Sequence, residues 1–416
     1  MIEWSDQHRM IQETVRKFVE AEIVPQLEEL EHGDLPPYDV LRKLFKTFGM
    51  DELARTRFDR QIARQESAGA SGAEESRAEQ EAKETSGDRG DAAAMQLIPL
   101  IEISRFCPGM VTAMGVSMGL TAASIMSKGT VAQKKRWARD LLTLEKIGSW
   151  AITEPASGSD AFGSMMSTAR RTEDGGYVLN GNKTFITNGP YADTIVFICK
   201  LDEPGVEPAD RKILTFVLDR GMEGLTQSRP LRKMGLHSSP TGELFLQDVK
   251  VGLDRLLGES ETGSGGRQGA KDTFSIERSG VAAMAYGIVD RCLELSVAYS
   301  KQRVQFGKPI GDFQLIQDKL ARMVVARMNI ENMLFRFIES AGAGRGLSFA
   351  EASAMKLYSA RAATEVALEA VQIHGGNGYM AEYQVEQLAR DAKVLQIYAG
   401  TDEIQISAIA RDLLSS

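Results

Sequence analysis

Glu277 is the carboxylate whose position in the sequence best suits acid–base chemistry. It falls in a segment that opens near Phe274, and apolar residues follow it at spacings of four and three, at Val281, Met284 and Ile288. This period predicts a helix with Glu277 on its apolar face. Such a carboxylate lies either in the exposed first turn, stabilised by the helix dipole, or in an apolar pocket that raises its pKa. The pattern alone favours the first, structural role, whereas the second would suit removal of a proton next to a carbonyl group.

Two loops rich in Gly, Ser and Asp could bring backbone N–H groups close to a polar or anionic ligand. They are residues 154–160 (EPASGSD) and residues 375–379 (GGNGY). A turn is the simpler interpretation of each, and neither is a dinucleotide fingerprint or a Walker loop. Thr401 precedes two acidic residues, which predicts the N-cap of a final helix with free N–H groups at its start.

Three successive hydrophobic patterns predict the elements that position these groups. Residues 1–145 have apolar positions at helical spacing, whereas residues 146–255 alternate or run continuously apolar between turn residues. Within the second region, Asn180-Gly181 after an apolar run predicts a hairpin turn. The helical spacing returns in residues 256–416. The chain is therefore predicted to consist of an N-terminal helical domain, a β domain and a C-terminal helical domain.

Two segments of the N-terminal region depart from this pattern. Residues 61–93 contain no large apolar residue except Ile62, which predicts a solvated helix or a mobile insertion. No charge occurs between Arg105 and Lys128, a length sufficient to cross a bilayer. Its residues are mainly Gly, Ser, Thr, Ala and Met, which favour membrane insertion only weakly. We therefore expect a central helix packed on all sides and no membrane span.

Composition excludes several functional classes. Lys and Arg number 49 against 57 Asp and Glu, a formal net charge of -8, so the chain lacks the basic surface of a nucleic-acid-binding protein. Cys107, Cys199 and Cys292 are far apart, which indicates free thiols in a reducing compartment. No two histidines have ligand spacing, so no metal site is expected. The N-terminus shows no signal-peptide pattern, and we expect a cytoplasmic protein.

Five segments, taken together and in this order, resemble successive motifs of the acyl-CoA dehydrogenases. They are residues 151–160 (AITEPASGSD), 179–189 (LNGNKTFITNG), 303–314 (RVQFGKPIGDFQ), 372–378 (QIHGGNG) and 397–401 (IYAGT). The resemblance covers nearly the whole chain apart from residues 61–93. It implies an α+β fold with an N-terminal helical domain, a middle β-barrel or β-sandwich domain and a C-terminal four-helix bundle.

The same resemblance implies a flavoenzyme that uses FAD. In this family an acyl-CoA thioester is oxidised to the trans-2-enoyl-CoA, because a base removes a proton from Cα while a hydride leaves Cβ for flavin N5. The electrons later pass to an electron-transfer flavoprotein. A homotetramer is the assembly that the resemblance implies.

Cofactor contacts are implied at two sets of positions, with Ser159 also expected to contact the substrate. Positions that line the flavin or pack at its ring are matched by Ile152, Thr153, Ser159, Phe185 and Thr187. Many members of the family have Trp where Phe185 stands. Positions that bind the adenosine and pyrophosphate half, largely across a subunit boundary, are matched by Arg303, Gln305, Phe306, Gln314, Gln372 and Gly376. Further FAD contacts are matched by Thr401 and Glu403.

Ala399 departs from the commonest family pattern, in which the catalytic Glu stands immediately before the Gly-Thr pair. In the isovaleryl-CoA and long-chain branches the base comes from a helix position matched here by Glu277, and a small residue stands where Ala399 does. The resemblance therefore implies that Glu277 is the base. The backbone N–H of Ala399 is expected to bond the thioester carbonyl, and Arg278 to support binding of the substrate.

Several alternatives stay open on the sequence. The same fold could act on an acyl group carried by acyl-carrier protein, or work as a flavin oxidase or desulfinase. A flavin-bound DNA-binding relative without dehydrogenase activity is disfavoured by the acidic balance of the chain and by the presence of Glu277. Acyl chain length and branching cannot be read from one sequence, although the position of the base resembles that of the branched-chain and long-chain enzymes.

Overall fold

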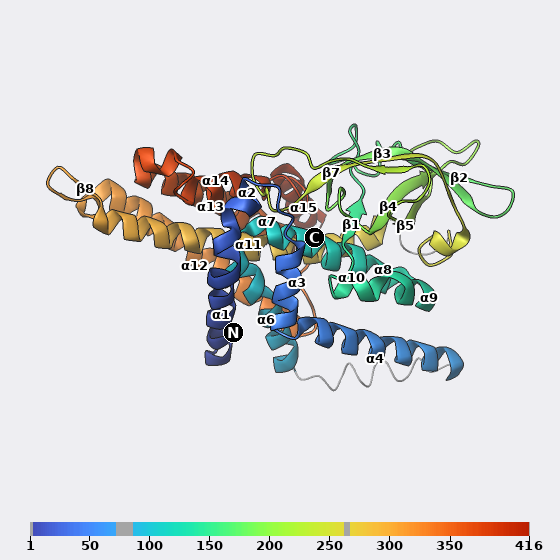
Figure 1. Ribbon diagram of the computed structural model, residues 1–416, viewed down its shortest axis with the longest axis horizontal. Helices are drawn as coiled ribbons and strands as arrows, with labels where there is room; N and C mark the ends of the chain where they lie inside the picture. The colour runs from blue at the N-terminus through green and yellow to red at the C-terminus, as the bar shows by residue number, and fades with distance from the viewer. Residues whose placement is uncertain (1–2, 72–85, 262–266, 416) are drawn as a thin grey trace.

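The computed structural model describes residues 3–71, 86–261 and 267–415, which form three regions in chain order (Figure 1). Helices form the N-terminal region, a mixed sheet forms the middle region, and long helices form the C-terminal region. The α+β fold with a helical, a β and a second helical domain is therefore confirmed.

The N-terminal region packs helices of different lengths around one buried segment. Its helices are α1 (Asp6–Phe18), η1 (Val19–Ile23), η2 (Val24–Gln26), α2 (Leu27–Glu31), α3 (Tyr38–Thr47), α4 (Met50–Ser71), α6 (Ser86–Ser104), α7 (Pro108–Gly115), η3 (Val116–Ala122), α8 (Ala123–Lys128), α9 (Val131–Gln133), η4 (Lys134–Ala138) and α10 (Arg139–Leu142). The charge-free stretch forms α7, η3 and α8, which are together long and apolar enough to cross a membrane. In this structure 67% of its apolar window is buried inside the protein, as in a core helix.

The predicted polar insertion is helical at both of its described ends. α4 continues to Ser71, and Ile62 of this helix packs with Phe58 against Trp137 and Leu141. α6 begins at Ser86. The remainder of the insertion, residues 72–85, lies outside the described residues, and its predicted mobility stays a prediction.

The middle region is a seven-stranded sheet centred on β4. Its elements are β1 (Gly148–Ala151), β2 (Thr168–Arg171), β3 (Tyr177–Thr187), β4 (Thr194–Leu201), β5 (Ile213–Asp219), β6 (Leu225–Gln227) and β7 (Thr241–Val251), followed by η5 (Leu253–Arg255). β4 pairs in parallel with β1 and β2 and antiparallel with β5, whereas β3 lies antiparallel between β2 and β7. Every residue of β4 is buried, as its continuous apolar run predicts.

The hairpin predicted at Asn180-Gly181 is wrong, because β3 continues through both residues. The pairing of β3 with β7 instead shifts register between Leu179 and Gly181. Gly181 has a φ of +151°, and a Cβ there would lie 2.1 Å from Oγ of Ser167. The side chain of Asn180 exchanges hydrogen bonds with Asp248 on β7. The Asn-Gly pair therefore forms a β-bulge rather than a turn.

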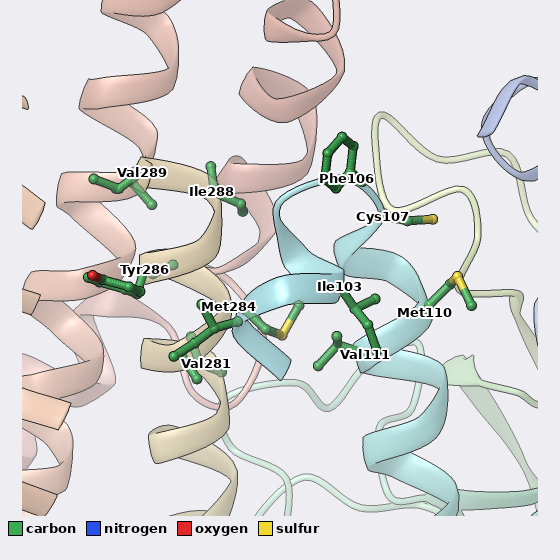
Figure 2. Packing of buried hydrophobic residues seen from close by; sticks show 14 of the residues in the cluster. Ile103, Phe106, Cys107, Met110, Val111, Val281, Met284, Tyr286, Ile288 and Val289 are labelled. Atoms are coloured by element: carbon green, nitrogen blue, oxygen red, sulfur yellow. The ribbon is translucent and has the colours of Figure 1, made fainter. Parts of the chain in front are cut away.

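The C-terminal region is arranged around α11, its central helix. Its elements are α11 (Arg267–Gln302), β8 (Val304–Gln305), β9 (Lys308–Pro309), η6 (Ile310–Asp312), α12 (Gln314–Gly342), α13 (Phe349–His374), η7 (Gly375–Tyr379), α14 (Val385–Val394) and α15 (Asp402–Ser415). α11 packs against α12, α13 and α14 and also against α6 and α7. Figure 2 shows Val281, Met284 and Ile288 of α11 in the same buried cluster as Ile103 and Val111.

Asn188, at the end of β3, joins the β domain to the N-terminal helices. It is fully buried and has a φ of +62°. Its Nδ2 donates to the carbonyl oxygens of Ala113 and Gly148, both at 2.9 Å, and its Oδ1 accepts from the hydroxyl of Tyr38 at 3.0 Å. One side chain therefore fastens β3, β1, α3 and α7 together.

We predict that Asn188→Ala lowers the free energy of unfolding by about 3 kcal/mol. Two buried carbonyl groups would each lose the amide of Asn188 as a donor, and Ala adopts the left-handed conformation less readily than Asn. Asn180→Ala, which removes a partly exposed Asn from the same strand, should cost less than about 1 kcal/mol. Urea unfolding followed by circular dichroism measures both, and equal losses would contradict the role of Asn188.

Candidate active site

Glu277 lies inside α11 and not in its first turn, because the helix begins at Arg267, earlier than the sequence pattern suggests. Its side chain is partly buried. Within the part of the chain that the structure describes, no hydrogen bond or ion pair reaches its carboxylate. Burial raises the pKa of Glu277 to about 7, and the charges of Arg278 and Lys356 act in the opposite direction. The environment is therefore the second of the two that the sequence allowed, a desolvated carboxyl group.

Arg278 points toward α13 and is itself buried. Its Nη1 donates to Oγ of Ser353 at 3.0 Å, and its guanidinium stacks 3.9 Å from the ring centre of Phe349. Burial lowers the pKa of Arg278 to about 10. In this structure its contacts are structural, and the expected contact with substrate stays a prediction.

The turn between α14 and α15 holds Ala399 and Gly400 in the left-handed conformation, with φ of +52° and +85°. Nε2 of Gln405 donates to the carbonyl oxygens of both residues at 2.9 Å. Nζ of Lys356 donates to the same carbonyl of Gly400 at 2.7 Å. The left-handed conformation costs roughly 1–2 kcal/mol at a residue such as Ala. These side-chain bonds therefore hold a backbone shape that Ala399 would not adopt by itself.

The N–H of Ala399 donates no hydrogen bond to any described group. The carbonyl groups of Ala399 and Gly400 both accept hydrogen bonds. The N–H of Ala399, in contrast, lacks a described partner. A free backbone N–H held by a strained turn is the kind of group that binds a ligand oxygen. Thr401 caps α15 as predicted, since its Oγ1 accepts from the N–H of Ile404 at 3.4 Å.

Three side chains to which the sequence analysis gave no role in the site connect this turn to α7 and α11. The hydroxyl of Tyr398 donates to Sδ of Met284 at 3.4 Å, and Oγ1 of Thr112 lies 3.9 Å from the same sulfur. Met284 is seven residues after Glu277 and so lies on the same face of α11. The charge of Glu277 also contributes to the raised pKa of Tyr398, after the larger effect of burial. Glu277, Met284 and Tyr398 therefore belong to one neighbourhood.

The residues predicted to line the flavin gather in the β domain. Nζ of Lys183 donates to the carbonyl of Ile152 at 3.1 Å, and the N–H of Thr184 donates to the carbonyl of Thr153 at 2.9 Å. These bonds place Ile152 and Thr153 beside the end of β3 that carries Phe185 and Thr187. Ser159 lies exposed in the loop that follows Thr153.

Phe185 has an unusual conformation for an aromatic residue. Its φ is +57°, and 69% of its side chain is exposed. The register of β3 against β7 shifts between Lys183 and Ile186, so a bulge turns the ring out of the sheet. An exposed ring on a strained backbone is suited to stacking on a flat ligand.

The second predicted set lies at the other end of the molecule. Arg303, Gln305 and Phe306 belong to the β8–β9 hairpin, and Gln314 begins α12 directly after it. Gln372 and Gly376 lie close to the same end, because His374 between them stacks on Tyr299 at 4.2 Å between ring centres. All six are exposed, and Phe306 is 94% exposed. Figure 1 shows β8 at one end of the molecule and β3 toward the other, so one chain does not bring the two sets together.

Thr401 and Glu403, the remaining cofactor positions, lie at the start of α15. Lys356 and Gln405, which hold the turn before this helix, were missed by the sequence reasoning. Lys356 carried a readable signal, because it stands among Ala and Met on the buried stripe of α13. Gln405 carried none, since one Gln four residues into a helix is ordinary.

Models of three protein-family domains match consecutive parts of the chain. "Acyl-CoA dehydrogenase, N-terminal domain" matches residues 5–54 and 80–145, "Acyl-CoA dehydrogenase, middle domain" matches residues 149–249, and "Acyl-CoA dehydrogenase, C-terminal domain" matches residues 264–414. The match runs through all three regions and leaves out residues 55–79, inside which α4 ends.

Curated relatives agree with this match along their whole length. A 3-(aryl)acrylate reductase from Clostridium sporogenes is 33% identical, over 99% of this chain and 99% of the relative. A mitochondrial isovaleryl-CoA dehydrogenase from Oryza sativa subsp. japonica is also 33% identical, over 99% and 92%. The names of these relatives therefore include both a reductase and a dehydrogenase.

Solved structures are similar to this chain in fold. Butyryl-CoA dehydrogenase from Megasphaera elsdenii is 32% identical with a TM-score of 0.81, and 100% of each chain is covered. An acyl-CoA dehydrogenase from Bacillus anthracis complexed with FAD is 29% identical with a TM-score of 0.76, over 99% of this chain and 68% of that one. A structure described with the electron transferring flavoprotein of Acidaminococcus fermentans is 28% identical with a TM-score of 0.81, over 100% of each chain. The chain therefore belongs to the acyl-CoA dehydrogenase family.

Proposed function

We propose that this enzyme oxidises an acyl-CoA thioester to the trans-2-enoyl-CoA, with Glu277 as the base that takes the Cα proton. The observation that carries the proposal is the state of Glu277, a partly buried carboxyl group without a hydrogen bond from any described residue and with a pKa raised to about 7. A base is most effective when its pKa is near the working pH, because it is then both deprotonated and strongly basic. Burial also raises the pKa of Asp391 on α14 to about 7, but the N–H of Leu236 and the side chain of Gln387 donate to its carboxylate, so it is not a free base.

The backbone N–H of Ala399 assists this proton transfer by binding the thioester carbonyl. A hydrogen bond from this N–H to the thioester carbonyl would stabilise the negative charge that develops on the oxygen as Cα loses its proton. The turn is held in place by Lys356 and Gln405 before any ligand arrives, so little reorganisation is needed. Replacement of the family's usual Glu by Ala399 removes a side chain and leaves the N–H.

The residues of the chain fit FAD. Phe185 offers an exposed ring beside Ile152 and Thr153, and a Cβ at Gly158, Gly375 or Gly376 would meet only open space. FAD, when bound, supplies the acceptor for the hydride that leaves Cβ. Phe185 and Thr187 would then hold the flavin ring, and Thr401 and Glu403 would contact the same cofactor.

The cofactor site needs two copies of the chain. Ile152, Thr153 and Phe185 lie in the β domain, whereas Arg303 and Phe306 lie at the far end of the helical bundle (Figure 1). One FAD cannot contact both sets within a single chain. We infer that the β8–β9 hairpin of a partner subunit binds the adenosine and pyrophosphate half, as in a homotetramer, and that an electron-transfer flavoprotein accepts the electrons.

Glu277→Gln should leave a folded, yellow protein whose flavin is not reduced by acyl-CoA. The amide is close in size to the carboxyl group and cannot accept the proton, so the rate of flavin reduction should fall about 10²–10⁴-fold. Anaerobic stopped-flow absorbance with a panel of acyl-CoA thioesters measures this rate and identifies the substrate. Glu294→Gln, on the same helix, is the matched control, and near-wild-type reduction by the Glu277 variant would exclude Glu277 as the base.

The rate of flavin reduction should rise with pH through about 7. Only the carboxylate form of Glu277 accepts a proton, and burial raises its pKa to about 7, so activity is lost as the pH falls below that value. The measurement is the pH dependence of kcat/KM. An acidic limb that stays near the pKa of an exposed Glu, about 4.3, would show that Glu277 is not the titrating group.

Arg303→Gln should weaken retention of FAD without unfolding the subunit. Loss of one charge-assisted hydrogen bond to a phosphate group should raise the Kd for FAD at least about tenfold. Arg57→Gln, at an exposed Arg of α4, controls for a general loss of positive charge. Fluorescence titration of apoprotein with FAD gives both constants, and equal values would contradict the assignment of the hairpin to the cofactor.

A further inference from the structure

Lys356 is a fully buried lysine about two turns after the start of α13. Its Nζ donates to the carbonyl oxygen of Gly400 at 2.7 Å, and Oδ1 of Asp402 lies 4.0 Å away. That oxygen of Asp402 receives no hydrogen bond within the described part of the chain. One carbonyl and one distant carboxylate replace the water around an ammonium group incompletely. Burial accordingly lowers the pKa of Lys356 to about 8.

Packing alone does not account for a charge at this position. Met has a similar length and would fill the same space without the cost of removing an ammonium group from water. The neighbours of Lys356 on the buried stripe of α13 include Ala352, Met355 and Ala360, which are all uncharged. We therefore expect a nearby group whose charge or hydrogen bonding depends on the ammonium group of Lys356.

The part of α11 that carries Glu277 lies against this face of α13. Nη1 of Arg278 donates to Oγ of Ser353 at 3.0 Å, which fixes the residue next to Glu277 on α13. Ser353 and Lys356 are three residues apart in one helix and so lie on the same face. The ammonium group of Lys356 therefore acts on the carboxyl group of Glu277, and it lowers the pKa that burial raises.

The other charges around this pair come from the neighbouring elements. Among the residues whose side chains the structure describes, the titratable groups that face Glu277 or Lys356 are Arg278 on α11, Asp402 and Glu403 on α15, and Tyr398 in the turn before α15. Nε of Arg361 donates to Oδ2 of Asp402 at 2.9 Å and so compensates part of its charge. Arg278 is occupied by Ser353 and Phe349. Among these described groups, Lys356 is the cation that both bonds the turn, at the carbonyl of Gly400, and lowers the pKa of Glu277 through its charge.

We propose that Lys356 is a positioning residue that couples the two catalytic groups of this enzyme: its ammonium group holds the carbonyl of Gly400, so that the N–H of Ala399 is presented to the thioester, and its charge favours the ionised form of Glu277. The proposal rests on the proposed function, because it assumes that Glu277 is the base. Lys356 lies on α13, whereas the base lies on α11 and the carbonyl-binding turn precedes α15, so one side chain acts on both groups.

Three substitutions separate the charge of Lys356 from its hydrogen bond. Lys356→Met removes both, Lys356→Gln keeps a donor without a charge, and Lys356→Arg keeps the charge. Lys200→Met is the matched control, because Lys200 is also buried and also donates to one backbone carbonyl, that of Gly163 in the β domain. Thermal unfolding of each variant reports whether the subunit is folded.

The first readout is the protonation of Glu277 itself, followed as the infrared carboxyl band that is absent from Glu277→Gln. In Lys356→Met and Lys356→Gln this band should titrate about one pH unit higher than in the wild type, because an opposite charge nearby favours the carboxylate. In Lys356→Arg and Lys200→Met the band should titrate at the same pH as in the wild type. An unchanged titration in both neutral variants would overturn the proposal.

The second readout is the pH profile of flavin reduction. The acidic limb should move to higher pH in both neutral variants, and at high pH Lys356→Gln should recover more of the wild-type rate than Lys356→Met because it can still bond Gly400. Equal rates for Gln and Met at high pH would exclude the role in holding the turn. If Glu277→Gln retains full flavin reduction, the proposed function fails, whereas the infrared titration still decides whether Lys356 controls Glu277.

Discussion

The removal of one carboxyl group from water is the constraint on which the rest of this structure depends. Glu277 lies on the central helix of the C-terminal region, and that helix packs against α6 and α7 as well as against α12, α13 and α14. Such packing makes a mid-helix carboxyl group a stronger base than an exposed one, because burial disfavours its charged form. In the same packing, an ionised Glu277 without a nearby cation would destabilise the fold, because a buried charge would be left unpaired. Lys356 and Arg278 are the nearby cations.

The second constraint is the backbone conformation of the turn at Ala399 and Gly400, which side chains of neighbouring helices hold in place. Ala399 and Gly400 have positive φ values, and Lys356 and Gln405 bind their carbonyl groups from the side of α13 and α15. This leaves the N–H of Ala399 without a described acceptor. Asn188 joins the β domain, which carries the exposed Phe185, to α7. Thr112 of α7 lies against Met284, to which Tyr398 donates, so α7 connects the end of β3 with the turn before α15.

The sequence predicted the order of the three regions and the family, but it was less reliable on local geometry. Hydrophobic period located α11 and its apolar face, yet not its start at Arg267, because residues before Phe274 have no apolar stripe. Asn180-Gly181 carried a hairpin pattern that pairing with β7 overrides. Ala399 could be interpreted only by resemblance, since a free N–H and a left-handed φ leave no trace in residue type. Lys356 was visible as a charge on an apolar stripe, but its partner, a backbone carbonyl, is invisible in any sequence.

The most direct test of the account is exchange of Cα protons in a thioester that has no Cβ hydrogen to lose. The acetyl group of acetyl-CoA has hydrogens on Cα and none on a Cβ, so incubation with the enzyme in D₂O isolates removal of the proton from transfer of the hydride. The account predicts that the wild-type protein accelerates incorporation of deuterium, measured by mass spectrometry, and that Glu277→Gln does not. Equal incorporation with both proteins would show that another group removes the proton and would contradict the central claim.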